Sequence, residues 1–446
     1  MDKRHAFEKL HSIGQGHLIQ DYDQLSKHQQ QGLLEQIERL QIPVFRKQQL
    51  LLMPTPHSPI RFLDPVLNSA AYGENSWSEQ GKGAIKQGLV GALLIAGGQG
   101  SRLRFNGPKG CFPVSVIKKK SLFQLFAEKT LAASIQANRP LPLAIMTSPL
   151  NTQATISYFE NHRYFGLEAS QVSFFAQELL PFLDDQGNLV PDPMGNIAEG
   201  PDGNGSCLRN FFDSGIWDIW YGSGVRLVNS VLIDNPLADP FDAELIGYHL
   251  DENADVVIKC TTREDPKEKV GLIAKHNDRI EIVEYTEVPE EVRNKKNDQG
   301  GLLYNLANLS LFSFSMDFIK SAAHKDLPLH RARKSAPTAK DPSPEKPNIW
   351  KFETFIFDTL QYATKIKTLI YPRDSSFSPL KNRNGRDSLE TVQQALLQRD
   401  RKIFQQITGT KPPDKPFELS QQFYYPTQEF AAQWAGKSFP NAGYIE

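Results

Sequence analysis

Between residues 88 and 372 the hydrophobic positions form short apolar runs, separated by segments with helical spacing. The apolar runs predict buried strands at Leu89–Ala96, Leu141–Thr147, Val172–Gln177, Val225–Ile233, Ala254–Cys260 and Lys365–Tyr371. The intervening segments predict helices at Ser121–Gln136, Thr152–Asn161, Leu208–Asp213 and Phe241–Glu252. Strands that alternate with helices build βαβ units, so we expect an α/β fold with a doubly wound, mainly parallel sheet.

Between residues 271 and 315 the alternation of strands and helices is interrupted. Arg279–Thr286 and Asn308–Phe314 alternate as strands do, so we expect an antiparallel insert between residues 271 and 315 that walls a substrate pocket. Asn348–Ala363 has helical spacing and predicts a helix.

The first 88 residues read mostly as helix. Asp21–Arg46 carries leucine and isoleucine at helical spacing, and Met53–Pro65 contains four prolines and predicts an extended connector. We therefore expect three parts: an N-terminal helical region over residues 1–88, the main α/β domain over 89–372, and a small C-terminal segment over 373–446.

Composition excludes several classes of protein. The 446 residues include 50 basic and 51 acidic side chains, so bulk charge does not hold the chain to nucleic acid or an anionic membrane. No apolar run approaches the ~18–20 residues that span a bilayer, and no secretory signal is evident. The three cysteines form no CxxC pair, which is typical of a reduced compartment. We expect a cytoplasmic protein without nucleic-acid or membrane partners, with a monomer favoured.

A glycine-rich loop follows the first predicted strand. Gly97, Gly98 and Gly100 let the backbone approach a ligand and offer N–H groups to anionic oxygens. Arg102 and Lys109 then supply cations, as a phosphate-rich ligand requires. Because this loop ends a strand of a doubly wound sheet, it lies where such sheets bind ligands.

Two common glycine loops do not fit this segment. A Rossmann fingerprint needs a third glycine where the chain has Leu103, and a helix that begins at once. A Walker A loop needs Gly-Lys-Ser/Thr, whereas Lys109 lies between Pro108 and Gly110. The loop belongs to another class of phosphate-binding site.

The order of motifs from this loop onward resembles the eukaryotic-type UDP-sugar pyrophosphorylase family, closest to its UDP-N-acetylglucosamine pyrophosphorylase branch. The loop is similar to the family's L-x-G-G-x-G-T-R-L-G…P-K. Further similar segments follow in the same order: Ser121–Leu125, Phe175–Gln177, Pro201–Gly205, Ile233–Asn235, Ala238–Pro240, Val270–Gly271, Val283–Tyr285, Tyr304–Asn308 and Phe377–Asn382. The resemblance covers roughly residues 94–382 and implies a Rossmann-like, GT-A-like nucleotidyltransferase fold.

The resemblance also implies an activity, in which UTP and a sugar 1-phosphate give a UDP-sugar and pyrophosphate. It assigns catalytic roles to three cations: Arg102 at the leaving phosphates, Lys109 at the α-phosphate and Lys381 at the sugar 1-phosphate. It assigns the nucleotide to Gly97, Gly98, Gly100, Gln177, Gly203 and Asn204, and the sugar to Gly271, Glu284, Asn308, Phe355 and Phe357. Asp234, directly after an apolar strand, is the candidate ligand for Mg²⁺, which prefers hard oxygen donors.

The residues themselves leave some alternatives open. Gln177 can be an ordinary glutamine at a strand end, and the segment from Asp202 to Ser206 can be only a turn before a helix. Phe355 and Phe357 cannot share a face of the predicted helix, so at least one of them is expected in the core. A non-catalytic nucleotide-sugar binding protein on the same fold is the distant alternative.

The sequence departs from the family pattern at several positions, which are Ser101 for Thr, Arg104 and Ser206 for Gly, and Leu306-Ala307 for Ala-Gly. Arg104 predicts either a changed backbone path or an extra phosphate contact. Leu306 and Ala307 add bulk where an N-acetyl group is expected, so the choice of sugar stays open. Ala96 and Gln99 favour the acetylhexosamine branch, while a glucose 1-phosphate uridylyltransferase or a broad UDP-sugar enzyme remains the alternative.

Overall fold

The computed structural model describes residues 2–53 and 63–446, which form two compact units. Of the described residues, the smaller unit combines 2–53 with 177–206 and 326–356, and the larger unit contains 63–176, 207–325 and 357–446. Most of the predicted connector 53–65 lies outside the described residues, and the predicted three-part division of the chain stays a prediction. Within the described ranges, no helix is long and apolar enough to cross a bilayer.

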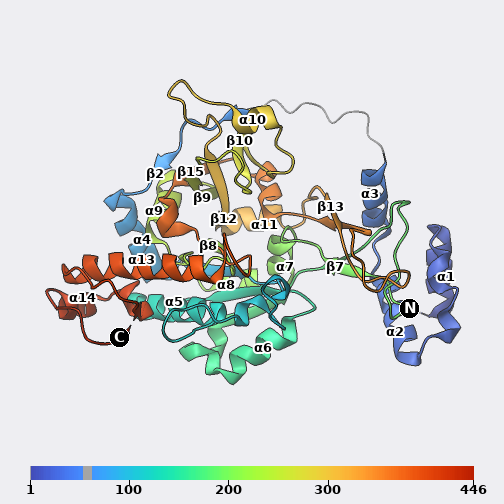
Figure 1. The fold of residues 1–446 in the computed structure, drawn as a ribbon, viewed down its shortest axis with the longest axis horizontal. Helices are drawn as coiled ribbons and strands as arrows, with labels where there is room; N and C mark the ends of the chain where they lie inside the picture. The colour runs from blue at the N-terminus through green and yellow to red at the C-terminus, as the bar shows by residue number, and fades with distance from the viewer. Residues whose placement is uncertain (1, 54–62) are drawn as a thin grey trace. The chain divides into compact units, whose positions relative to one another are not determined.

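The larger unit is built on one twisted sheet, of which β8, β9, β12 and β15 are labelled in Figure 1. Its main path runs β2 (Ala70–Ala71), β15 (Ile366–Ile370), β9 (Val256–Thr262), β12 (Leu306–Ser315), β8 (Leu227–Leu232), β3 (Val90–Ile95), β4 (Leu143–Thr147) and β5 (Val172–Ala176). All neighbours on this path are parallel except β12, which is antiparallel to both β9 and β8. The predicted α/β fold with a mainly parallel sheet is therefore confirmed.

The antiparallel strands differ in part from their predicted arrangement. β10 (Leu272–His276) and β11 (Arg279–Val283) form an antiparallel hairpin, and β1 (Asp64–Pro65) pairs with β10. β12, however, lies at the centre of the main sheet instead of beside it. The reason is burial, because β12 is buried on both of its faces along most of its length and therefore needs a neighbour on either side.

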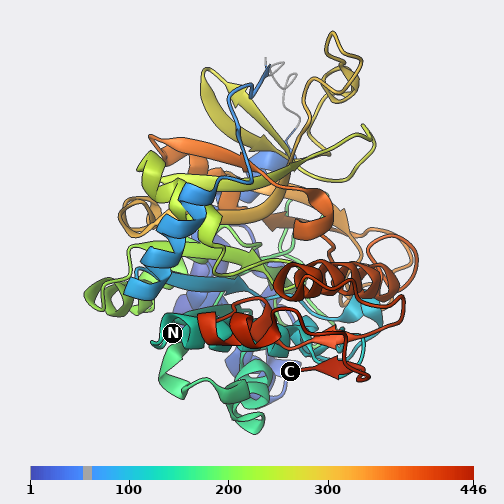
Figure 2. The same cartoon turned by 90° about the vertical axis from the view of Figure 1, so that its left-hand side faces the viewer.

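Helices surround this sheet. They are α4 (Asn75–Gln87), α5 (Leu122–Ala137), α6 (Thr152–Asn161), α7 (Cys207–Asp213), α8 (Ile216–Gly222), α9 (Ala243–Glu252), α10 (Glu290–Asn294), α11 (Met316–Ala322), α12 (Arg373–Ser376), α13 (Leu389–Thr408) and α14 (Gln428–Trp434). α4 and α9 pack together, as Figure 2 shows. Glycine permits their close approach, since a Cβ on Gly247 would lie 1.8 Å from the carbonyl oxygen of Trp77.

Short elements complete the larger unit. Turns of 3₁₀ helix are η3 (Ser101–Leu103), η4 (Lys109–Cys111), η5 (Arg163–Gly166), η6 (Ala169–Gln171) and η8 (Gln421–Phe423), and β16 (Glu418–Leu419) pairs with β17 (Tyr444–Ile445). Ser121 caps α5, because its hydroxyl accepts the N–H of Gln124. The four predicted helices and six predicted strands are present, with ends shifted by one or two residues.

The prediction of a helix at 348–363 is wrong. Residues Ile349–Glu353 form strand β14, and residues Ile356–Tyr362 form the 3₁₀ segment η7. β14 pairs with β13 (His330–Lys334) in an antiparallel ribbon. The ladder hydrogen bonds supplied by a partner about 15 residues earlier in the chain overrode the local helical spacing, which carries no information about such a partner.

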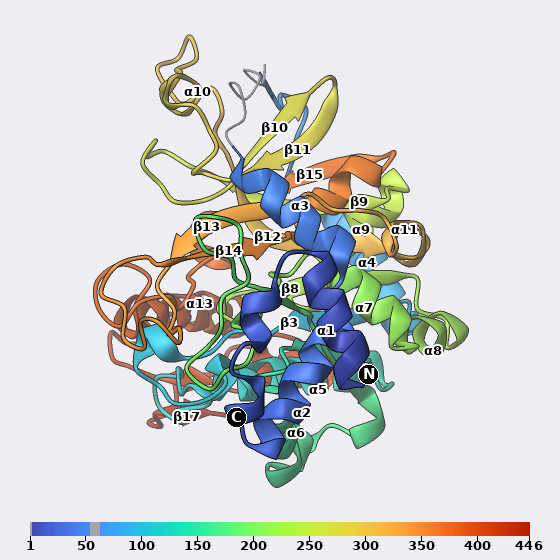
Figure 3. The same ribbon diagram turned by 90° about the vertical axis from the view of Figure 1, so that its right-hand side faces the viewer.

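The smaller unit joins N-terminal helices to two short ribbons, and Figure 3 shows the helices in blue. Its elements are α1 (Lys3–Ser12), η1 (Gly16–Ile19), η2 (Tyr22–Gln24), α2 (Lys27–Arg39), α3 (Ile42–Leu52), β6 (Leu179–Pro181), β7 (Glu199–Pro201), β13 and β14. Leu10, Leu33, Phe45, Leu183 and Phe352 are fully buried in its core. The N-terminal helices thus fold on segments that lie far away in the sequence.

The segment 21–46, which has helical spacing in the sequence, forms more than one helix in the structure. A 3₁₀ turn comes first, Ser26 caps α2, and α2 ends before Leu40, whose ψ of 113° is not helical. Pro43 lies in the first turn of α3, where its missing N–H has no intrahelical partner to lose. The proline therefore starts a new helix instead of continuing the old one.

The order of strands in the larger unit places the candidate loops together. From β3 the chain passes to β4 and then β5 on one side, whereas β8 pairs with β3 on the other side. The carboxyl ends of β3 and β8 therefore meet where the direction of winding reverses. Ligands of doubly wound sheets bind at such a position.

Candidate functional site

The glycine loop after β3 is closed by its own main-chain hydrogen bonds. Gly100 N–H donates to the carbonyl of Gly107 (3.0 Å), and Lys109 N–H donates to the carbonyl of Gly98 (3.0 Å). Gln99 and Pro108 form an isolated bridge between the two sides. The loop is therefore a narrow hairpin-like structure, with Arg102 in its tip and Lys109 at its base.

The glycines of the loop differ in whether the surrounding fold leaves room for a side chain. A Cβ on Gly100 would lie 2.8 Å from the Cβ of Phe105, so packing inside the loop requires glycine there. Gly98 is exposed, and a Cβ on it would meet no atom of the chain within 4 Å. Nothing in the described fold requires glycine at 98, which favours a ligand that approaches the backbone at that point. Gly97, which lies between β3 and Gly98 in the chain, is buried.

Arg104 retains the backbone conformation that glycine favours. Its φ is 54° and its ψ is 36°, in the left-handed region that costs most residues free energy. The family pattern that the sequence resembles has glycine at this position, and Arg104 adopts a conformation that glycine adopts easily. The predicted change of backbone path and its alternative, an extra phosphate contact, stay predictions.

Lys109 and Asp234 meet at the carboxyl ends of β3 and β8. The Nζ atom of Lys109 lies 3.8 Å from Oδ2 of Asp234 and donates to the carbonyl of Leu380 (3.1 Å). Both side chains are mostly buried, with exposed fractions of 17% and 15%. Asp234 follows β8 directly, so the pair joins the two loops at the reversal of winding.

A third segment reaches the same point from the C-terminal part of the chain. The N–H of Leu380 donates to the main-chain carbonyl of Asp234 (2.7 Å), which brings Lys381 beside the pair. Burial is the largest cause that lowers the pKa of Lys109, and Lys381 and Arg102 lower it further, while Asp234 raises it. The structure therefore places Lys109 beside Asp234, with Lys381 and Arg102 near enough to act on the charge of Lys109.

Asp234 has one oxygen available for a ligand. Its Oδ1 atom is buried and has no hydrogen-bond partner among the residues that the structure describes. A buried carboxylate oxygen without a partner is costly unless a ligand or ion completes it. Among the described residues no group of three or more His, Cys, Asp or Glu could hold a metal, so a cation here would take most of its ligands from substrate oxygens and water.

Three of the predicted sugar-site residues lie around the junction of β10, β11 and β12. The N–H of Asn308 donates to the carbonyl of Gly271 (2.9 Å), and the place for a Cβ on Gly271 lies 3.0 Å from Ile282. Asn308 Oδ1 accepts the N–H of Ser310 at a bulge in β12. Glu284 follows β11 directly and is partly buried.

The departures at Leu306 and Ala307 lie in the same strand. Both residues belong to β12, where they pair with Thr262 and Thr261, and both are buried. Phe357 is also buried, in η7, and the predicted helix that should separate it from Phe355 does not exist.

Four predicted site residues belong to the smaller unit. Gln177 comes directly after β5 and is buried. Gly203 has φ of +90°, and a Cβ on it would lie 2.2 Å from the carbonyl oxygen of Thr354. Asn204 Oδ1 accepts the N–H of Ile356 (3.0 Å). Contacts within the fold therefore explain the conformation of the turn at 202–206, and its predicted contact with the uracil base stays a prediction. The ring of Phe355 packs on His330, and its predicted contact with the sugar also stays a prediction.

Comparison with known proteins decides the family. The family model described as UTP–glucose-1-phosphate uridylyltransferase matches residues 72–432. The chain belongs to the UTP–glucose-1-phosphate uridylyltransferase family. The resemblance inferred from the motifs is confirmed, and the chain is an enzyme of the UTP:sugar-1-phosphate uridylyltransferase class.

Relatives in the UTP–glucose-1-phosphate uridylyltransferase family match nearly the whole chain. The UDP-N-acetylglucosamine pyrophosphorylase of Saccharomyces cerevisiae is 30% identical over 468 residues, covering 97% of each chain. UDP-N-acetylglucosamine diphosphorylase 2 of Arabidopsis thaliana is 31% identical and covers 87% of this chain and 82% of its own. The crystal structure of the uridine diphosphate N-acetylglucosamine pyrophosphorylase from Trypanosoma brucei shares the fold, with a TM-score of 0.83 at 24% identity over 100% of this chain and 98% of its own.

Sequence reasoning missed the side chains that hold the site loops. Asn151, fully buried, reaches towards the carbonyls of Ala96 and Gly98 through Nδ2 (3.4 Å to each). Asn235 donates to the carbonyl of Ser376 (2.8 Å) and accepts the N–H of Ser378. A polar residue directly after an apolar strand was the available signal for Asn235, while Asn151 follows a loop and gave none.

Proposed function

We propose that the chain transfers the uridylyl group of UTP to N-acetylglucosamine 1-phosphate, releasing pyrophosphate and forming UDP-N-acetylglucosamine. The observation that supports this most is the pair of Lys109 and Asp234 where the sheet's winding reverses, with Lys381 and Arg102 near enough to act on the charge of Lys109. Transfer of a nucleotidyl group requires positioning and charge stabilisation and little covalent chemistry. Cations and exposed backbone N–H groups can position the phosphates and stabilise their charge.

The reaction joins one oxygen and releases another at the same phosphorus atom. A phosphate oxygen of the sugar 1-phosphate attacks the α-phosphorus of UTP, and the bond to the bridging oxygen of pyrophosphate breaks. Lys109 stabilises the charge that grows on the α-phosphate, and Arg102 binds the leaving pyrophosphate. Lys381 binds the sugar 1-phosphate, and Gly98 presents its exposed backbone to the nucleotide.

Asp234 is proposed to hold a divalent cation, Mg²⁺. Its unpartnered buried Oδ1 is a hard oxygen of the kind that Mg²⁺ binds together with substrate phosphates. When bound, the ion supplies Lewis-acid neutralisation of phosphate charge. Asp234 itself then orients the polyphosphate relative to Lys109.

The remaining contacts are proposed on the family resemblance. Gln177, Gly203 and Asn204 bind the uracil end of the nucleotide, since an amide offers a donor and an acceptor to a base edge. The sugar lies near Gly271, Glu284, Asn308, Phe355 and Phe357. The three reduced cysteines, Cys111, Cys207 and Cys260, support a cytoplasmic location.

The choice of sugar rests on the relatives. The yeast and Arabidopsis proteins are named for UDP-N-acetylglucosamine, whereas the family description names glucose 1-phosphate. Glucose 1-phosphate is therefore the second candidate, and the buried Leu306 and Ala307 near Asn308 are the residues on which the choice turns.

The test supplies UTP and Mg²⁺ with four acceptors in parallel: the 1-phosphates of N-acetylglucosamine, N-acetylgalactosamine, glucose and galactose. Pyrophosphate release and the UDP-sugar formed are both measured. We expect N-acetylglucosamine 1-phosphate to give the highest kcat/KM. A preference for glucose 1-phosphate would overturn the proposed sugar, and no product with any acceptor would overturn the proposed reaction.

A further inference from the structure

One buried and one partly buried basic side chain hold the turn that follows Asp234. Three consecutive main-chain carbonyls of this turn, at residues 236, 237 and 238, accept hydrogen bonds from side chains. The ammonium of Lys129, on α5, donates to the carbonyls of Pro236 and Ala238 at 2.7 Å each. Arg399, on α13, donates to the carbonyl of Leu237 at 2.6 Å.

Lys129 is an unusual residue for a helix that packs on the core. Its side chain is 2% exposed and its hydrogen bonds go to main-chain carbonyls, so no carboxylate bonded to it neutralises its charge. Burial lowers the pKa of Lys129 well below its usual value, and nearby Arg399 lowers it further. An apolar side chain of similar length would serve the core better on stability alone. The presence of a lysine at position 129 therefore needs an explanation other than stability.

The turn controls where Asp234 lies. Ala238 N–H donates to the carbonyl of Asn235 (3.0 Å), and the Asn235 side chain bonds to residues Ser376 and Ser378. Residues 234–238 are thus tied from α5, from α13 and from the segment that carries Lys381. A shift of the turn would move the Asp234 carboxylate relative to Lys109.

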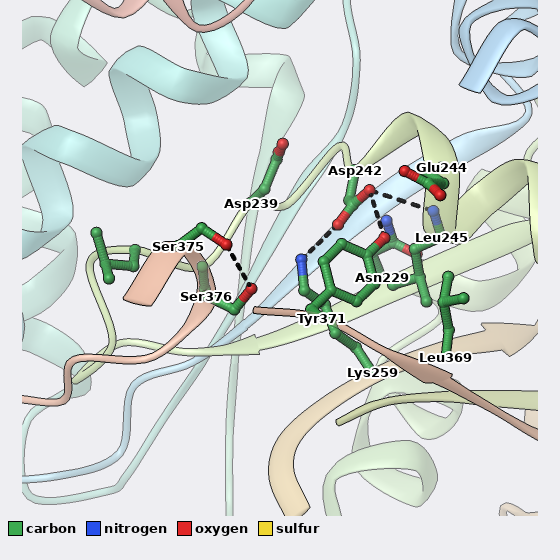
Figure 4. Close-up of polar contacts among 12 residues, drawn as sticks. Asn229, Asp239, Asp242, Glu244, Leu245, Lys259, Leu369, Tyr371, Ser375 and Ser376 are labelled. Atoms are coloured by element: carbon green, nitrogen blue, oxygen red, sulfur yellow. Dashed lines mark hydrogen bonds and ion pairs between the residues drawn. The ribbon is translucent and has the colours of Figure 1, made fainter. Parts of the chain in front are cut away.

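The far end of the same loop is fixed by a separate ionic cluster. Figure 4 shows Lys259 and Tyr371 converging on Asp242, which also caps α9 through the N–H of Leu245. Asp239 lies apart from them and accepts the hydroxyl of Tyr425. Since this end has its own anchor, the contacts of Lys129 act on the half of the loop that carries Asp234.

We propose that Lys129 is a positioning residue for uridylyl transfer, which holds the turn at 235–238 so that the Asp234 carboxylate faces Lys109. This inference rests on the proposed role of Asp234 in the reaction. Lys129 touches neither substrate, and it acts through the two carbonyls that it binds.

The kinetic test compares four proteins with the wild type: Lys129→Met, Asp234→Asn, the double variant, and Thr130→Val. Thr130 is the matched control, because it is the next residue on α5, is equally buried, and also donates to a main-chain carbonyl. We expect Lys129→Met to lower kcat/KM by about 10- to 100-fold, as a small misplacement of a catalytic group does. In the Asp234→Asn background the same change should cost less than about twofold, because residues that act through one another are not additive.

A second readout does not depend on activity. Hydrogen exchange of the main-chain amides at 234–238 should accelerate in Lys129→Met and remain at the wild-type rate in Thr130→Val. The inference is overturned if Lys129→Met behaves like Thr130→Val in both measurements, or if its kinetic cost is the same in the Asp234→Asn background. If Asp234→Asn alone retains wild-type activity, the proposed role of Asp234 fails instead, and the exchange result still tells whether Lys129 holds the turn.

Discussion

The Nζ atom of Lys109 lies 3.8 Å from Oδ2 of Asp234, although 125 positions separate the two residues in the chain. Each residue follows a parallel strand, and β3 and β8 are neighbours, so the pair is a direct product of the sheet topology. Leu380 contacts both, through its N–H to Asp234 and its carbonyl to Lys109. The candidate catalytic cations therefore come together without a basic surface, in a chain whose formal net charge is −1.

The glycine loop gives a prediction that separates ligand binding from folding. Gly98→Ala places a methyl group in open space, so the free energy of unfolding should change little, by about 0.5 kcal/mol. If the nucleotide lies on the Gly98 backbone, the same methyl group should raise the KM for UTP at least about tenfold. Thermal unfolding and steady-state kinetics measure the two effects.

Gly100→Ala is the matched control for Gly98→Ala. Its added methyl group would meet Phe105 at 2.8 Å, so this variant should lose stability in addition to activity. Should Gly98→Ala leave the KM for UTP at the wild-type value, the nucleotide does not approach the loop at residue 98.

Arg104 offers a stabilising substitution. Because the φ of Arg104 is 54°, Arg104→Gly removes a backbone strain of about 1 kcal/mol from the native state. Glycine also raises the conformational entropy of the unfolded chain, which offsets part of this gain in stability. The free energy of unfolding should rise by about 0.5 kcal/mol. Arg102→Gly, in the helical turn η3 two residues earlier, should lower it instead, and chemical denaturation of both variants checks the opposite signs. A loss of stability in Arg104→Gly would argue that the Arg104 side chain makes a contact worth more than the strain.

The pH dependence of stability should depend on Asp400. Burial raises the pKa of the Asp400 carboxyl to about 7, although Leu419 N–H and the Tyr424 hydroxyl donate to it. The native state therefore holds a proton that the unfolded state has lost, so this residue's contribution to stability falls as the pH rises from about 4 to about 7. Asp400→Asn removes that component, and its free energy of unfolding relative to the wild type should rise between pH 5 and pH 8. A difference that stays constant over this range would contradict the raised pKa.

The sequence predicted the parallel core of the fold because each strand there is a local signal. Runs such as Leu89–Ala96 are buried on both faces, and their apolar character is visible without knowing their neighbours. β14 shows the limit, since its strand conformation depends on pairing with β13 and its local pattern suggested a helix. The position of β12 between β8 and β9 is likewise a property of the sheet and not of the segment.

The C-terminal helix α13 was missed although a signal existed. Val392, Leu396 and Phe404 are its buried apolar residues and recur at helical spacing, but the many polar residues between them lower the mean hydropathy of the segment. This helix carries Arg399, one of the two cations that hold the Asp234 turn. The other, Lys129, is a basic residue in the largely apolar sequence of α5, and that position does not indicate which carbonyls it binds.

At the candidate site, residue identities were predictable and their supports were not. Arg102, Lys109, Asp234 and Lys381 belong to motifs that can be recognised by order, and the structure brings them together. The hydrogen bonds that set their geometry are made to main-chain atoms, as at Leu380, and main-chain atoms leave no trace in residue type. No pattern of letters could have shown which carbonyl Lys109 or Lys129 binds.

The most direct test of the account is the rate of pyrophosphate release by Lys109→Ala, with UTP, Mg²⁺ and N-acetylglucosamine 1-phosphate at saturation. Lys109 is predicted to stabilise charge on the α-phosphate, so kcat should fall by about 10²- to 10³-fold. The thermal unfolding midpoint should stay near that of the wild type, because the fold loses only one hydrogen bond, to Leu380, and an ion pair whose charged atoms are 3.8 Å apart. A folded Lys109→Ala protein that releases pyrophosphate at the wild-type rate would contradict the account.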